Sequence, residues 1–134
     1  MIIKSANESR IVSVGSSDYF FSLYSTIRIR LDSFKNQISM VLNFFDSGIC
    51  HHKDCIETAR QLNLVRDMLS SVAVKDLVYD MNDPKKKAPW EDNISPVVTS
   101  CGNLFTTSDG KDMLYEIVSI LTYGFYSEND VIIG

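Results

Sequence analysis

The stretch "DCIETARQLNLVRDMLSSV", residues 54–72, decides how the rest of the chain can fold. Its apolar side chains recur at intervals of three and four residues, which places them on one face of an α-helix. They are Ile56, Ala59, Leu62, Val65, Leu69 and Val72. Asp54 stands at the N-cap position with Glu57 three residues later, the pattern of a capping box. The sequence therefore predicts a helix over 54–72 whose apolar face must be covered by other elements.

One further helix is predicted on each side of this stretch. The first spans 34–45 and stops at Gly48, with its apolar residues at helical spacing. These residues are Phe34, Ile38, Val41 and Phe45. The second is capped by Asp109 together with Asp112 and ends near Gly124. Its apolar face is made of Leu114, Ile117, Val118 and Leu121.

Short β-branched runs predict the strands of a sheet. These runs are residues 10–14, 76–81 and 130–134, with a further short strand expected near 103–107. The segment 26–31 is predicted to be a half-buried strand, because Ile27, Ile29 and Leu31 alternate with two arginines. That prediction requires Ile29 to face the helices. Residues 18–25 fit either a strand or a helical turn.

These elements predict an α+β fold in which a small sheet of about four or five strands is covered by about three helices. The chain has 134 residues, of which 45% are apolar and 22% charged, typical of a globular domain. We therefore expect residues 1–134 to form a single domain, an α/β sandwich in outline.

The composition also indicates a cellular compartment. No apolar run reaches the ~20 residues that span a bilayer, and the first residues lack the apolar core of a signal peptide. The three cysteines, Cys50, Cys55 and Cys101, are too few and too uneven in number for a disulfide framework. We expect a cytoplasmic protein that does not enter a membrane.

The charge is distributed unevenly along the chain. Residues 1–75 carry nine basic and seven acidic side chains, net +2, whereas residues 76–134 carry four basic and ten acidic side chains, net −6. Binding to nucleic acid requires clustered basic side chains, which this chain lacks. The acidic second half instead favours a basic protein as the partner.

A metal site is conceivable in "CHHKDC", residues 50–55, since cysteine and histidine are metal ligands. Adjacent histidines rarely turn to one ion, and no second ligand pair exists elsewhere in the chain. We interpret the segment as a polar connection between helices, and we expect neither a metal nor a cofactor.

Catalytic patterns are weak. Ser108 and Lys111 have the S-x-x-K spacing of serine acyl-enzymes without its companion motifs, and they fit a turn equally well. Both histidines lie in one segment, and no glycine-rich phosphate loop is present.

Two pairs of acids, Asp80 with Asp83 and Glu91 with Asp92, could in principle act as acid and base. We assign no catalytic residue. A small enzyme using the Asp-rich loops or Ser108, and a regulatory ligand-binding module, remain the alternatives.

The segment "PWEDNISPVVTSCGNLFTTSDG", residues 89–110, is predicted to be an ordered crossing segment, because its prolines and Gly102 prevent one long helix. The preceding residues 82–89 read as an exposed loop, whose three lysines are neutralised by nearby acids. Trp90 is either a core anchor or an exposed contact for a partner, and core packing is the default for a single tryptophan.

The segment "APWEDNISPVVTSCGNLFTTSDGKDML", together with "IRIRL" and the closing "DVII", resembles a family of bacterial immunity proteins of polymorphic toxin and contact-dependent growth inhibition systems. The resemblance covers nearly the whole chain and is densest at 88–114. Ala88 and Lys111 depart from the family pattern, which has proline at the first position and arginine at the second. Gly102 and Leu104 also depart from it, at positions where small and aromatic residues are usual.

This resemblance implies a small α+β protein that binds and neutralises a cognate toxin domain without catalysis. The toxin is expected to be basic, a nuclease being one candidate. The exposed acids and the tryptophan of the second half are our predicted partner contacts. They are Asp80, Asp83, Trp90, Glu91 and Asp92.

Overall fold

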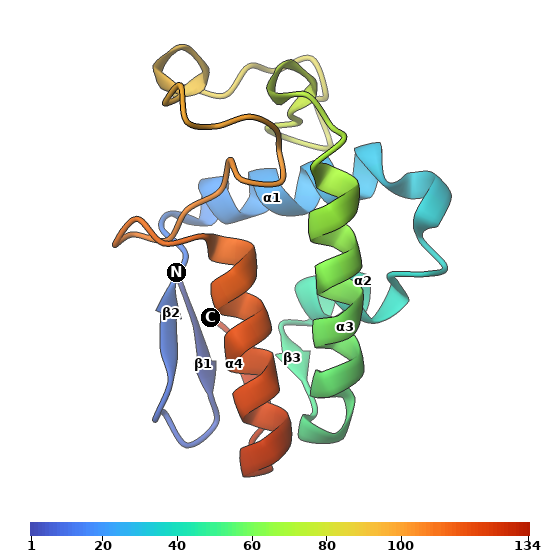
Figure 1. Cartoon of the computed structure of the whole chain (residues 1–134), viewed down its shortest axis with the longest axis vertical. Helices are drawn as coiled ribbons and strands as arrows, with labels where there is room; N and C mark the ends of the chain where they lie inside the picture. The colour runs from blue at the N-terminus through green and yellow to red at the C-terminus, as the bar shows by residue number, and fades with distance from the viewer.

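The two ends of the chain meet in the middle of a four-stranded antiparallel sheet (Figure 1). The computed structural model describes residues 1–134. The strands are β1 (Ile2–Ser5), β2 (Ile11–Ser13), β3 (Ile49–Cys50) and β4 (Val131–Ile133), in the order β2-β1-β4-β3. The strands predicted at 10–14 and 130–134 are confirmed. No pattern predicted β1, whose four residues show no clear alternation of polar and apolar side chains.

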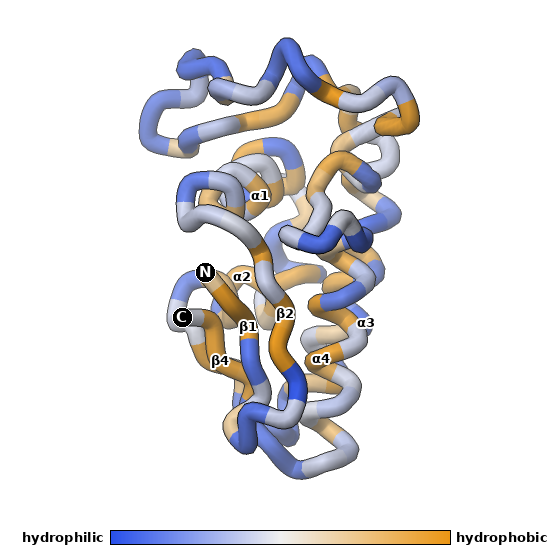
Figure 2. Tube along the Cα trace, turned by 90° about the vertical axis from the view of Figure 1, so that its left-hand side faces the viewer, coloured by the Kyte–Doolittle hydropathy of each residue, from blue (hydrophilic) through white to orange (hydrophobic).

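The alternation of side chains gives the sheet one covered and one open face. Ile3, Val12 and Val131 point into the core and are buried. On the other face, Lys4 lies opposite both Ile11 and Ile132, and the Ile11 side chain is exposed. Figure 2 shows the helices α3 and α4 on one side of these strands.

The covered face is packed against two long helices, α3 (His52–Leu69) and α4 (Met113–Ser127), which run side by side (Figure 1). The predicted helix at 54–72 is therefore confirmed, although it starts and ends earlier. Leu62, Val65 and Leu69 are fully buried, as its apolar face predicted, whereas Ile56 is exposed. No helix of the chain is long and apolar enough to cross a membrane.

The predicted strand at 26–31 is wrong, because these residues form the last turns and the end of helix α1 (Ser17–Arg30). Ile27 and Leu31 are buried at helical spacing, but Ile29 is 40% exposed instead of facing the other helices. The ambiguous segment 18–25 belongs to the same helix. Over this longer stretch the buried apolar side chains follow a helical period. They are Phe20, Leu23, Tyr24, Ile27 and Leu31.

The helix predicted at 34–45 is confirmed only in its second half. A 3-10 turn, η1 (Asp32–Phe34), precedes helix α2 (Ser39–Ser47), and Phe34 is exposed rather than part of an apolar face. Gly48 ends α2 in the left-handed conformation with φ of 80°, so the predicted stop is confirmed.

The helix caps differ partly from the predicted ones. The N-cap of α3 is His51, and Asp54 lies within the first turn. A carboxylate from another element does the capping, because Asp130 Oδ1 accepts the backbone N–H of His52 at 2.8 Å. Asp112 caps α4 by accepting the backbone N–H of Tyr115, whereas Asp109, which was predicted to cap with it, lies in the preceding turn. The helix continues past Gly124 to Ser127.

Two predicted strands are absent. Residues 74–76 form a short 3-10 turn, η2 (Val74–Asp76), and 77–81 join no sheet. Near 103–107 the only ladder contact is an isolated bridge between Thr106 and Asp112. The strand predicted at 76–81 is absent because side chains of α1, and not a neighbouring strand, bind the backbone of this segment, as described below. The predicted α+β class is confirmed, with four helices and four strands.

Candidate interaction surface

Residues 77–112 form a loop layer across α1 and the adjoining ends of α3 and α4 (Figure 1). We call this segment the loop layer, and the remainder of the chain the body. The loop layer contains only one short helical turn, η3 (Glu91–Asn93). It contains all five predicted partner contacts.

One end of the loop layer is attached to α1 by hydroxyl groups. Val78 is fully buried, and its carbonyl oxygen accepts hydrogen bonds from Ser22 Oγ at 3.0 Å and Thr26 Oγ1 at 3.1 Å. The backbone N–H of Val78 donates to Thr26 Oγ1, and that of Met81 donates to Ser25 Oγ at 3.0 Å. Because buried polar groups require partners, these bonds fix where the loop layer lies on the helix. This polar face of α1 went unrecognised in the sequence, although its closely spaced hydroxyl residues were a signal.

The other end is attached to the end of α3. The backbone N–H of Cys101 donates to the carbonyl oxygen of Val72 at 2.9 Å, and the Cys101 side chain is buried. Gly102 passes close to the backbone of Ser70, since a Cβ on the glycine would lie 3.0 Å from the Ser70 nitrogen. A larger residue at 102 would therefore displace this crossing.

Trp90 is both an anchor and a part of the surface. Its ring packs edge-on against Tyr19 of α1, with 5.3 Å between the ring centroids, and is 6.4 Å from the ring of Phe105. The Tyr19 hydroxyl accepts the backbone N–H of Thr106 at 3.0 Å. Tyr19 therefore ties the segments around Trp90 and Thr106 to α1. Trp90 remains half-buried. These contacts support the role of Trp90 as an anchor, while its contact with a partner stays a prediction.

A groove of about 300 Å³ opens beside Trp90. Its apolar wall consists of Tyr19, Trp90, Ile94, Val97, Val98 and Leu104. Val97 follows Pro96 and is 77% exposed, the largest exposure among the big apolar side chains of the chain. An exposed apolar side chain beside a half-buried tryptophan is the kind of feature that anchors protein partners. Val97 was not among the predicted contacts.

The four predicted acidic contacts do not line this groove, although Glu91 and Asp92 directly follow Trp90 in the chain. Asp83 and Asp92 are exposed, while Asp80 and Glu91 are partly buried. None of the four forms an ion pair. Asp80 has a local structural role, because its Oδ1 accepts the backbone N–H of Asn82 at 2.8 Å. The predicted exposed loop over 82–89 is confirmed except at Ala88, which is buried.

The S-x-x-K residues Ser108 and Lys111 line one pocket, but each is paired with another side chain. The ammonium group of Lys111 lies 3.4 Å from Asp109 Oδ2, and the Ser108 hydroxyl lies 2.8 Å from that of Ser13. A hydrogen bond from the Thr107 hydroxyl holds the pKa of Asp109 below its usual value. These contacts stabilise a turn that leads into α4, and neither of them pairs the Ser108 hydroxyl with a base.

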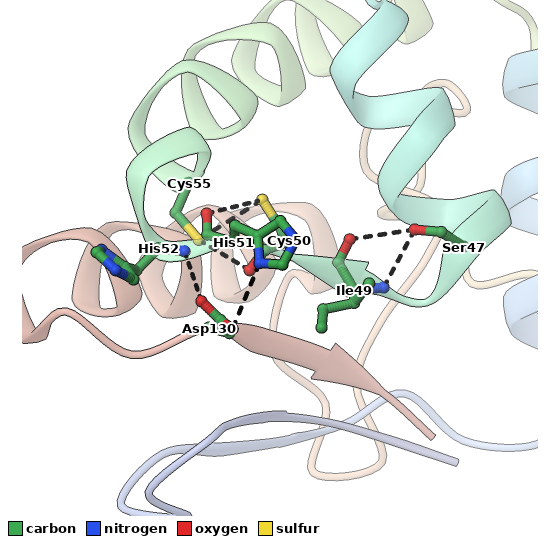
Figure 3. Close-up of polar contacts among 7 residues, drawn as sticks. All are labelled: Ser47, Ile49, Cys50, His51, His52, Cys55 and Asp130. Atoms are coloured by element: carbon green, nitrogen blue, oxygen red, sulfur yellow. Dashed lines mark hydrogen bonds and ion pairs between the residues drawn. The ribbon is translucent and has the colours of Figure 1, made fainter.

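The "CHHKDC" segment lies at the end of α3 away from the loop layer (Figure 1), where β3 joins α3 (Figure 3). Asp130 accepts the His52 backbone N–H and lies 3.5 Å from His51 Nδ1, while the sulfur atoms of Cys50 and Cys55 are 3.6 Å apart. No group of three or more His, Cys, Asp or Glu side chains is arranged to hold a metal ion. The segment connects α2 to α3 through β3.

Comparison with known proteins gives one match. The model of a protein family described as immunity protein 70 matches residues 6–133, nearly the full length. No curated protein and no solved structure matches significantly.

Proposed function

The chain belongs to the immunity protein 70 family, and from that membership we propose that it binds a cognate bacterial toxin domain and neutralises it by stoichiometric protein–protein interaction. The family match over residues 6–133 is the observation that carries this proposal. An immunity protein of this kind acts in the cytoplasm of a cell with a polymorphic toxin system, such as one for contact-dependent growth inhibition. In that role the chain works as a single domain without a cofactor.

The loop layer is the surface that we assign to the toxin. A stable interface typically buries about 800 Å² on each partner, with a few central anchors and a polar rim. Val97 and Trp90 supply anchors beside a groove, and the same loop layer carries four carboxylates that form no ion pair within the chain. Such a surface needs no chemistry of its own to block a toxin.

The charge of this surface fits a basic target. The loop layer carries six acidic side chains and four lysines, net −2, and Asp80, Asp83, Glu91 and Asp92 are four of those acids. Opposite potentials accelerate encounter and favour the correct partner. A toxin that acts on nucleic acid carries a basic cleft for phosphates, so a nuclease domain fits this surface.

A titration tests the proposed mode of action. The toxin domain encoded next to this chain is assayed for its activity, and for growth arrest in cells, with increasing amounts of the purified or co-expressed protein. We expect toxin activity to fall linearly to zero at one equivalent, with a 1:1 complex on co-purification. Protection at far below one equivalent would instead indicate an enzyme that modifies the toxin, and an absence of binding and protection would contradict the proposed function.

A further inference from the structure

Two of the three cysteines lie next to each other at the junction of β3 and α3 (Figure 3). Cys50 lies in β3, and Cys55 lies in the first turns of α3. Their sulfur atoms are 3.6 Å apart, and the Cys55 thiol donates toward both the sulfur and the carbonyl oxygen of Cys50. Cys101 lies elsewhere, in the loop layer, with its sulfur near the carbonyl oxygen of Ala73.

The two thiols have different surroundings. Thr58 Oγ1 lies 3.4 Å from the sulfur of Cys50, and the N-terminus of α3, which favours negative charge, begins two residues after Cys50. The hydrogen bond from Cys55 lowers the pKa of Cys50. The same contact, together with burial, raises the pKa of Cys55. Cys50 is thus the thiol that ionises first, and Cys55 is its protonated neighbour.

Cys50 also has a route to solvent. Its side chain lines a pocket of about 100 Å³ together with His51, Asp54 and Thr58. A pocket of this size admits a small oxidant such as a hydroperoxide. Cys55 is fully buried behind Cys50, beside Gly124 of α4, where a Cβ on the glycine would lie 3.3 Å from its sulfur. Reagents therefore reach Cys50 first.

We propose that Cys50 and Cys55 form a dithiol that hydroperoxides oxidise to an intramolecular disulfide. The Cys50 thiolate attacks one peroxide oxygen, the O–O bond breaks, and the leaving oxygen takes up a proton. The resulting Cys50 sulfenic acid is attacked by the Cys55 sulfur, an S–S bond forms, and water leaves with the Cys55 proton. With hydrogen peroxide, two thiols and one peroxide give one disulfide and two waters.

The geometry favours this product over further oxidation. The sulfur atoms must approach from 3.6 Å to the bonded distance of about 2.05 Å, which is a small movement. Cys50 lies in a two-residue strand at the edge of the sheet, where such a movement disturbs few neighbours. Because Cys55 is already in contact, it captures the sulfenic acid before a second peroxide arrives.

The test uses the reduced full-length protein, treated with one equivalent of hydrogen peroxide and measured as intact mass under non-reducing conditions. We expect a loss of about 2 Da, with peptide mapping that links residues 50 and 55. The Cys101→Ala variant should behave identically. The Cys50→Ala variant should not lose this mass, and Cys55→Ala should leave a sulfenic acid on Cys50 that a dimedone probe labels. Circular dichroism establishes that each variant is folded.

Two results would overturn the proposal. The first is a native protein that keeps its reduced mass after treatment. The second is oxidation that proceeds equally at Cys101. That thiol is expected to react slowly, because burial raises its pKa to about 11 and no second sulfur contacts it. Dimedone mapping on the native protein, trapped early, decides the order of attack without any substitution: the label should appear on Cys50 and not on Cys55.

Discussion

The body and the loop layer are stabilised in different ways. In the body, the sheet and the helices bury most of a continuous apolar core, to which the loop layer adds Cys101, Leu104 and Phe105, and three of the five ion pairs have at least one partner there on a regular element. In the loop layer, a few docking contacts near Val78, Trp90 and Cys101 fix the chain, while acids and Val97 stay on the surface. The comparison indicates that most of the core lies in the body, whereas the loop layer carries the exposed side chains that we assign to a partner.

The largest expected effect is a truncation in the body. Leu62 is fully buried in α3, so Leu62→Ala should lower the free energy of unfolding by ~2–5 kcal/mol through lost burial and a cavity. Val97→Ala in the loop layer, at an exposed site, should change it by less than ~0.5 kcal/mol. Urea unfolding monitored by circular dichroism measures both. Equal losses for the two variants would contradict the distinction between the regions.

A smaller effect is expected from the anchor that joins the two regions. Trp90→Ala removes the ring contacts with Tyr19 and Phe105 and should cost ~1–3 kcal/mol. It should also make the loop layer more sensitive to proteolysis than the body, because fewer contacts then hold it. The exposed Tyr126→Ala is the matched control, with little effect on either quantity. Cleavage that starts in the body would show that Trp90 serves the whole core.

How far the sequence predicted the body can be judged from particular residues. The predictions of the apolar face of α3 and of the helix end at Gly48 were correct, because both features depend on local sequence. The strand at 26–31 was wrong because a short alternation, Ile27 to Leu31, fits a helix once the preceding turns and the Ser16 cap are included. Asp130 was missed as a cap because it lies far from α3 in sequence.

The loop layer was predicted less completely. Its exposed loop and its crossing path follow from its prolines and charged residues, and both were predicted correctly. Its attachment to the hydroxyls of α1 and the prominence of Val97 depend on tertiary contacts that no local pattern encodes. The assignment of Asp80, Asp83, Trp90, Glu91 and Asp92 as toxin contacts stays a prediction.

A loss of stability below that of Leu62→Ala and Trp90→Ala is expected at the cap within the body. Asp130→Ala should cost about 1 kcal/mol, because the His52 backbone N–H loses its acceptor. Asp130→Asn keeps an acceptor and should cost less. The pKa of Asp130 is lowered by the His52 N–H bond, so the stabilisation by its charge is complete at neutral pH and is lost as the pH falls through the pKa of the folded state. The stability difference between the native protein and the Asn variant should therefore shrink in acid. A difference that grows in acid would contradict this role.

The most direct test of the central claim, that the loop layer is the toxin-binding surface, is the association rate with the cognate toxin domain at two salt concentrations. Asp83→Lys with Asp92→Lys changes two exposed acids of the loop layer, and Glu8→Lys with Glu128→Lys makes the same charge change at exposed acids of the body. The loop-layer variant should associate at least ~10-fold more slowly at low salt, with a smaller difference at high salt, while the body variant stays close to the native rate. Equal rates for the two variants, at both salt concentrations, would contradict the claim.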